Sequence, residues 1–218
     1  MVLAAVFDND GLLLDTEEAW TRAEVRLFAG RGSTFTMAHK RDLIGSSHTV
    51  AATKLEAMLG LPGQGAALRD ELVVLVHEEA AAEPILPRPG AVGLLDSLGE
   101  AGVPIALASN SLRPFVDLVL SSAGLTDRFQ VVVSGDEVAR PKPAPDLYLA
   151  ACAGLGVDPS AAVALEDSPT GVAAAKAAGM RVIGVPYLDG IVLDADVVAA
   201  SLADDAVHAA LGLGRRER

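Results

Sequence analysis

Four short clusters of polar residues hold the side chains best suited to chemistry in this sequence. Their members are carboxylates, a lysine, a hydroxyl and amides, and the clusters are Asp8-Asn9-Asp10, Ser109-Asn110, Lys142 and Glu166-Asp167. Each lies in a loop after a short apolar run of the kind that forms a buried strand. Parallel strands end at one edge of a sheet, where open α/β sheets bind ligands. The spacing therefore predicts a single site built from four loops.

The residue types in this predicted site fit phosphoryl transfer. The carboxylates of Asp8 and Asp167 are hard oxygen ligands of the kind that Mg²⁺ prefers. Carboxylates alone would repel a phosphate dianion, whereas a divalent ion removes that repulsion and neutralises charge on the transferred oxygens. Lys142 would add a second positive charge. This interpretation requires Asp8 and Asp167 to lie close enough to share one ion.

The same clusters indicate a division of roles. Asp8 can act as a nucleophile because a free aspartate, with a pKa of about 3.9, is ionised at neutral pH. Asp10 can reach the leaving oxygen as a general acid and later activate water as a general base. Ser109, with backbone N–H groups at Asn9 and Asn110, would hold the remaining phosphate oxygens.

The elements that must position these clusters alternate between strand and helix patterns. Apolar strand-like runs occur at 2–7, 104–108, 131–134, 161–165 and 181–185, and a further edge strand is expected at 195–199. Helix-period stretches cover 92–100, 113–122, 145–153 and 170–178, with a last helix near 204–211. This alternation predicts an α/β fold with a doubly wound, Rossmann-like parallel sheet.

One segment interrupts that alternation. Between residues 15 and 86 the sequence contains amphipathic helical stretches at 17–29, 37–44, 50–59 and 66–82 and no strand-like run. We therefore expect a core made of residues 1–14 and 87–218, with an inserted all-helical cap at 15–86. An insertion directly after the first strand lies above the carboxyl ends of the strands. The cap would cover the predicted site.

The charge and composition of the chain limit the kinds of partner that it is expected to bind. The 218 residues carry a formal net charge of −12, which argues against a nucleic acid or an anionic membrane as partner. The apolar run at the N-terminus is too short for a signal peptide or a membrane span. A single cysteine, Cys152, cannot form an intramolecular disulfide. We expect a cytoplasmic monomer or weak homo-oligomer whose partner is a small phosphorylated metabolite.

Four sequence motifs resemble those of the haloacid dehalogenase superfamily, helical-cap subfamily, in the order in which that family has them. They are VFDNDGLLLDTE at 6–17, ASNS at 108–111, RPKPAPD at 140–146 and LEDSPTG at 165–171. The resemblance implies a nucleophile at Asp8 and an acid/base at Asp10. It also implies Mg²⁺ held by Asp8, the Asp10 carbonyl and Asp167, with Glu166 acting on the ion through water.

Within that superfamily the motifs favour a phosphatase. Members that act as dehalogenases lack an acid/base at the position of Asp10. The first motif, followed by Trp20, looks most like phosphatases of sugar and polyol phosphates. A phosphomutase similar to β-phosphoglucomutase is the alternative, although that branch usually has a histidine at Trp20 and an arginine near His48. A non-catalytic binding protein on the same fold is a third reading. Glu17, Trp20 and His48 are the cap residues expected to contact substrate.

Overall fold

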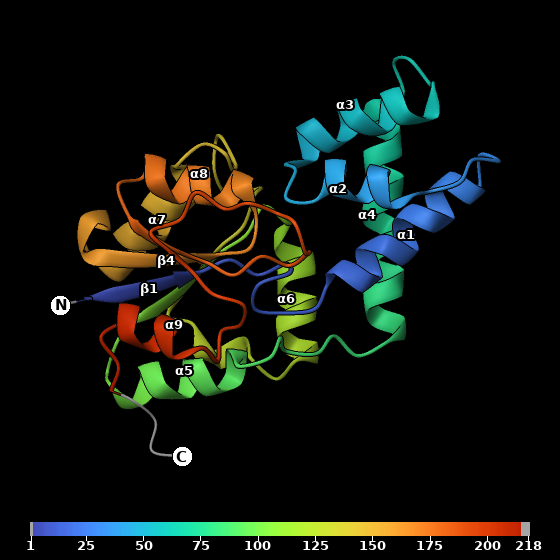
Figure 1. Cartoon of the computed structure of the whole chain (residues 1–218). Helices are drawn as coiled ribbons and strands as arrows, with labels where there is room; N and C mark the ends of the chain where they lie inside the picture. The colour runs from blue at the N-terminus through green and yellow to red at the C-terminus, as the bar shows by residue number, and fades with distance from the viewer. Residues whose placement is uncertain (1, 215–218) are drawn as a thin grey trace.

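The computed structural model describes residues 2–214 of the chain. Within that range, strands form one parallel sheet in the order β3-β2-β1-β4-β5-β6 (Figure 1). Its strands are β1 (Ala4–Phe7), β2 (Ile105–Ala108), β3 (Val131–Val133), β4 (Ala162–Glu166), β5 (Arg181–Gly184) and β6 (Val197–Val198). The predicted fold class is confirmed, and the expected edge strand is only two residues long.

Alternate residues of the central strand β1 supply two separate hydrophobic cores. Ala4 and Val6 pack with residues of α7 (Asp146–Leu155) and α8 (Pro169–Ala177). Ala5 and Phe7 pack on the other face, with residues of α5 (Ala91–Glu100), α6 (Arg113–Ser122) and α9 (Asp205–Ala210). Short 3₁₀ helices precede two strands, at Thr126–Arg128 and Pro159–Ala161. Because β1 is buried on both faces, its sequence is uniformly apolar until the chain leaves the sheet.

The segment between β1 and α5 forms a separate helical layer, as the sequence predicted. It consists of α1 (Glu17–Ala29), α2 (Met37–Leu43), α3 (His48–Leu59) and α4 (Gly65–Ala82), and Figure 1 shows it beside the carboxyl ends of the strands. Leu27, Leu72 and Val76 lie in its interior. On its surface Arg26 bonds to Glu79 at 2.7 Å and Arg31 bonds to Glu71 at 2.6 Å. We call this layer the cap.

The chain leaves and re-enters the core through two short segments that lie side by side. Leu14 and Pro87 form an antiparallel bridge. The Asp15 N–H donates to the Leu86 carbonyl at 2.9 Å, and the Arg88 N–H donates to the Leu13 carbonyl at 2.9 Å. We propose that the cap begins at residue 15 and ends at residue 86, on either side of this bridge.

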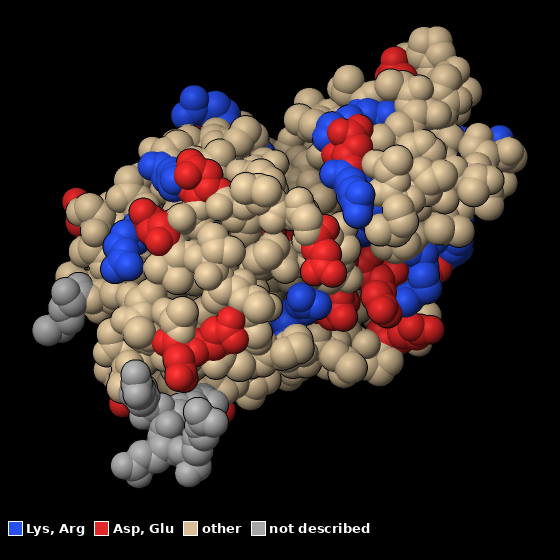
Figure 2. Space-filling view, viewed as in Figure 1, with Lys and Arg blue, Asp and Glu red and all other residues tan. Residues whose placement is uncertain are grey.

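Charge on the surface is mixed in sign. In Figure 2, acidic and basic side chains lie next to one another over both the core and the cap. Among residues 2–214, no helix is both long enough and apolar enough to cross a membrane.

Candidate active site

The loop after β1 turns sharply so that two aspartates face the same region. Asp8 follows the strand directly, and its N–H donates to the Leu165 carbonyl at 3.0 Å, which extends the pairing between β1 and β4 by one residue. Gly11 has a φ of +85°, and a Cβ there would collide with the Asp167 carboxylate. A glycine at this position therefore lets the first and fourth clusters approach each other.

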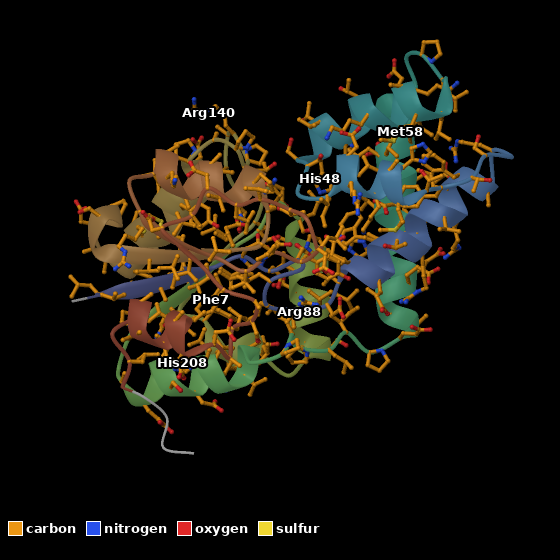
Figure 3. The ribbon with its side chains drawn as sticks, viewed as in Figure 1. Phe7, His48, Met58, Arg88, Arg140 and His208 are labelled. Carbon is orange, nitrogen blue, oxygen red and sulfur yellow. The ribbon has the colours of Figure 1, made fainter. Side chains whose placement is uncertain are left out.

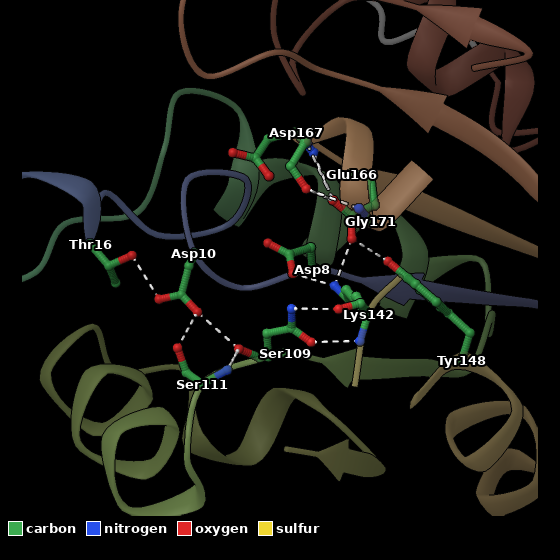
Figure 4. Close-up of polar contacts among 12 residues, drawn as sticks. Asp8, Asp10, Thr16, Ser109, Ser111, Lys142, Tyr148, Glu166, Asp167 and Gly171 are labelled. Carbon is green, nitrogen blue, oxygen red and sulfur yellow. Dashed lines mark hydrogen bonds and ion pairs between the residues drawn. The ribbon is translucent and has the colours of Figure 1, made fainter. Parts of the chain in front are cut away.

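Lys142 joins the third cluster to the first and fourth. Its Nζ lies 2.5 Å from Asp8 Oδ1 and 2.6 Å from Glu166 Oε1, and the residue is 2% exposed (Figure 4). Its backbone N–H donates to Asn110 Oδ1 at 2.8 Å, which ties the loop to the second cluster. Burial lowers the pKa of Lys142, but the Asp8 and Glu166 carboxylates outweigh it and raise the pKa above its ordinary value. The ammonium therefore stays charged.

Glu166 is fully buried and surrounded by donors. Besides Lys142, its Oε1 accepts from the Tyr148 hydroxyl at 2.6 Å. Its Oε2 accepts from the Asp167 N–H at 3.1 Å and the Ser168 hydroxyl at 3.2 Å. A Cβ at Gly171 would collide with this carboxylate, so α8 packs closely against it. These donors stabilise the buried Glu166 carboxylate without a direct bond to a metal ion. Glu166 in turn orients the Lys142 ammonium.

Asp167 has the opposite environment. Its side chain is 2% exposed, and its carboxylate accepts no hydrogen bond from the residues that the structure describes. One oxygen from each of Asp8, Glu166 and Asp167 lies within 4.8 Å of the others. Burial, followed by the charges of Asp8 and Glu166, raises the pKa of Asp167 well above its usual range. Burial likewise raises the pKa of Asp8, against the opposing effect of Lys142.

The charge balance of this cluster fits a bound divalent cation. Asp8, Asp10, Glu166 and Asp167 contribute four carboxylates, and the Lys142 ammonium pairs with two of them, Asp8 and Glu166. A buried carboxylate is stable in the charged form only with a partner, and the Asp167 carboxylate accepts no hydrogen bond among residues 2–214. Oxygen ligands at this spacing are the type that Mg²⁺ binds. The required proximity of Asp8 and Asp167 is met.

Asp10 lies between the cap and the second cluster. Its Oδ1 accepts from Thr16 Oγ1 at 2.8 Å, and its Oδ2 accepts from the hydroxyls of Ser109 and Ser111, each at 2.9 Å (Figure 4). Ser109 was expected to contact phosphate, and in this arrangement its hydroxyl donates to Asp10 instead. Its phosphate contact stays a prediction. Thr16 and Ser111 were not predicted as site residues.

Asn9 combines a backbone N–H that can bind an anion with a buried side chain that has no hydrogen-bond partner. Its backbone N–H and that of Asn110 donate to no acceptor among the described residues, which leaves both N–H groups able to bind an anion. The Asn9 side chain is fully buried, and neither its Oδ1 nor its Nδ2 has a hydrogen-bond partner. A buried polar group without a partner costs about 1–3 kcal/mol.

Replacing Asn9 with leucine is therefore expected to stabilise the protein. The variant keeps the backbone N–H and removes the unpaired amide, so the free energy of unfolding should rise by about 1–3 kcal/mol. Urea denaturation measures this change. Asn110→Leu is the matched control. The Asn110 side chain donates to the Lys142 carbonyl and accepts from the Lys142 N–H, so its loss should destabilise the protein. A destabilised Asn9→Leu variant would contradict the argument.

A cavity of about 100 Å³ lies between these core residues and the cap. Its floor contains Asp8, Asp10, Asn110, Ser111, Lys142 and Asp167. All three predicted cap residues, Glu17, Trp20 and His48, line its upper wall. Figure 3 shows His48 on the side of the cap that faces the core, and burial lowers its pKa. The structure thus brings every predicted site residue to one cavity or its immediate border.

Two charged cap residues of this wall were not predicted from the sequence, Glu24 and Arg69. Glu24 is two helical turns beyond Glu17, and Arg69 comes from α4. The cap loop at Gly45 also reaches the core, because a Cβ there would lie 2.9 Å from the Ser168 Cβ. Cap and core therefore touch at the wall of the cavity. The spacing of Glu17, Trp20 and Glu24 on one helical face was the available signal.

The chain is similar in sequence to a known family of hydrolases and to several characterised proteins. A model of the haloacid dehalogenase-like hydrolase family matches residues 2–179. Hexitol phosphatase B of Escherichia coli is 36% identical over 189 residues, covering 85% of this chain and 84% of that protein. Protein CbbY of Rhodobacter capsulatus is 34% identical over 194 residues, covering 84% and 85%.

A solved structure is similar over almost the whole chain. It is a variant of CbbY from Rhodobacter sphaeroides in complex with xylulose-1,5-bisphosphate, with a TM-score of 0.81 and 31% identity. The match covers 94% of this chain and 96% of that one. The likeness thus includes both the sheet and the inserted helices.

Proposed function

The chain belongs to the haloacid dehalogenase-like hydrolases, and we propose that it is a magnesium-dependent phosphatase of a sugar or polyol phosphate. One observation carries this proposal: the buried Asp8 carboxylate pairs with the Lys142 ammonium and has an oxygen within 4.8 Å of one in the buried Asp167 carboxylate. A nucleophile, a fixed cation and carboxylates that can hold a second cation are the parts that phosphoryl transfer needs.

The first step would form a bond between Asp8 and phosphorus. An Asp8 oxygen attacks the phosphoryl group, the bond to the alcohol oxygen breaks, and an aspartyl phosphate results. Lys142 keeps its proton and stabilises the phosphoryl oxygens as charge develops on them. Asp8, Asp167 and the Asp10 carbonyl would hold Mg²⁺, which when bound neutralises negative charge on those oxygens.

Asp10 would move the protons in both steps. As a carboxylic acid it donates its proton to the departing alcohol oxygen. The resulting carboxylate then takes a proton from the water that attacks the aspartyl phosphate, which releases inorganic phosphate and restores Asp8. The hydroxyls of Thr16, Ser109 and Ser111 would hold this carboxyl group in position through both steps.

The substrate class is supported by the relatives and by the cavity. Hexitol phosphatase B is named for a polyol phosphate, and the CbbY structure holds a phosphorylated ketose. The cavity wall adds polar cap residues above the phosphate site, which suit a small hydroxylated metabolite.

Phosphate release from a panel of sugar and polyol phosphates tests the proposal. We expect Mg²⁺-dependent release from several members and loss of activity in excess EDTA. A hexose 1-phosphate should give free phosphate, whereas conversion to the 6-phosphate would indicate the mutase alternative. No release from any phosphate ester in Mg²⁺ would contradict phosphatase activity and favour a binding protein on this fold.

Magnesium alone should stabilise the folded protein. A ligand that binds only the folded state at 100 times its dissociation constant adds about 2.7 kcal/mol, which corresponds to a rise in Tm of about 5–10 °C. Thermal denaturation with Mg²⁺ and with EDTA measures the difference. Asp167→Asn should lose this shift, and Asp117→Asn, at an exposed carboxylate of α6, should keep it. An equal shift in all three proteins would contradict the assigned ion site.

A further inference from the structure

A buried ionic cluster lies in the cap, directly above the proposed phosphate site. Glu17, Glu24 and Lys40 are 6%, 4% and 3% exposed, although charged residues are rarely buried in so small a layer. Lys40, on α2, forms an ion pair with the Glu17 carboxylate and donates to the Glu17 carbonyl at 3.1 Å. Its Nζ lies 3.6 Å from Glu24 Oε2, within the range of an ion pair.

Both glutamates line the cavity. Glu17, Trp20 and Glu24 are spaced by three and four residues along α1, so they share one helical face, and all three line the cavity. Glu17 lies at the phosphate end, since a Cβ at Gly11 would approach both its Cγ and the Asp167 carboxylate. Glu24 is about 10 Å farther along the helix axis. The pair therefore extends along the cavity wall away from the proposed phosphate site.

This cluster has more acceptors than donors. Lys40 is one ammonium shared by two carboxylates. Glu24 Oε2 has no hydrogen-bond partner, and burial raises the pKa of Glu24 to about 7. Its contact with Lys40 at 3.6 Å is an ion pair without a hydrogen bond, and a buried oxygen that accepts no hydrogen bond is costly. A hydroxyl group of a bound substrate would supply the missing donor.

Resting on the phosphatase function above, we propose that Glu17 and Glu24 bind hydroxyl groups of the alcohol part of the substrate. The substrate is then a monophosphate whose carbon chain carries hydroxyls and no second anionic group beside Glu24. A second phosphate at that end would meet two carboxylates whose shared ammonium is already paired, and the like charges would repel it.

Arg69 is the cation of the cavity wall that could favour the opposite outcome. It lies on α4, is one-third exposed, and its guanidinium already pairs with Asp70 at 2.8 Å. A bisphosphate would have to displace that pairing. Whether the wild-type protein prefers a monophosphate or a bisphosphate shows which dominates, the Glu17 and Glu24 carboxylates or the Arg69 guanidinium.

Three monophosphates and one bisphosphate test the proposal. A hexitol 6-phosphate carries the hydroxyls, n-hexyl phosphate lacks them, and an aryl phosphate reports the core chemistry alone. We expect kcat/KM for the hexitol phosphate to exceed that for n-hexyl phosphate by about 100-fold or more, because a site built for hydroxyls rejects analogues without them. A hexitol 1,6-bisphosphate should be a poorer substrate than the hexitol 6-phosphate.

Variants at Glu24 then isolate the contribution of this side chain. Glu24→Leu should lower kcat/KM for the hexitol phosphate by about 10- to 100-fold and change turnover of n-hexyl and aryl phosphate little. Glu24→Gln keeps the shape of the side chain and should narrow the difference between monophosphate and bisphosphate. Glu18→Gln, on the exposed side of the same helix, is the control and should change neither ratio.

The outcomes separate the two proposals. Absence of aryl phosphate turnover in the wild-type protein would overturn the phosphatase function. Aryl turnover without a preference for the hexitol phosphate over n-hexyl phosphate would overturn only the hydroxyl site. A preference for the bisphosphate, or a Glu24→Gln variant that loses activity equally on every substrate, would also overturn it.

Discussion

Replacing Asp8 with asparagine is expected to lower kcat for every phosphate ester by at least about 10⁴-fold, the order of loss that follows removal of a covalent nucleophile. The amide has almost the same shape but cannot attack phosphorus or carry the phosphoryl group. Lys142 keeps its partner Glu166, so the loop should stay in place. Steady-state release of phosphate measures the loss.

The Asp8→Asn variant should be at least as stable to unfolding as the wild-type protein when no metal ion is bound. Burial raises the pKa of Asp8, which means that its charged form is unfavourable in the folded protein without an added cation. The neutral amide avoids that cost, and in EDTA the Tm of Asp8→Asn should equal or exceed that of the wild-type protein. Asp117→Asn serves as the control for activity. Turnover of Asp8→Asn within tenfold of the wild type would end the covalent mechanism.

Replacing Asp10 with asparagine should have an effect that depends on the leaving group. An alkoxide needs a proton when it departs, so turnover of a polyol phosphate should fall by about 10²–10⁴-fold. An activated aryl phosphate needs no proton to depart, so Asp8 can still be phosphorylated. Hydrolysis of the aspartyl phosphate lacks its base, and the phosphorylated enzyme should accumulate.

A rapid-mixing experiment detects that accumulation. With an aryl phosphate, Asp10→Asn should release a burst of phenolate equal to the enzyme concentration, followed by a slow phase. Ser111→Ala is the matched control, because it removes one of the three hydroxyls that hold Asp10 and leaves the carboxyl group itself. Equal losses on alkyl and aryl esters without a burst would contradict the assignment of Asp10 as acid and base.

The fold and the floor of the site were predictable because both depend on local pattern. The uniformly apolar β1 indicates a strand buried on both faces, and Asp8 is placed by being the next residue. Since parallel strands share their carboxyl edge, the position of Glu166 and Asp167 at the end of the fourth predicted strand was sufficient to bring them to Asp8.

Residues that act through helix packing were not predictable in the same way. Tyr148 occurs in an apolar helix and resembles an ordinary core residue, yet its hydroxyl bonds to Glu166. Lys40 is flanked by His39 and Arg41 and resembles a surface lysine, yet the contact of α2 with α1 buries it. Glu24 became a candidate only when the orientation of α1 over the cavity was known. Periodicity identifies a buried face but does not say what that face covers.

The backbone bridge at Leu14 and Pro87 has a consequence for how such proteins diversify. The two chain segments are joined by main-chain hydrogen bonds, and these do not depend on which side chains follow. From the standpoint of the sheet, the inserted helices are one peripheral loop closed at its base. A different helical module could be spliced between these two positions, and the catalytic apparatus would be inherited unchanged while the repertoire of accepted molecules was replaced.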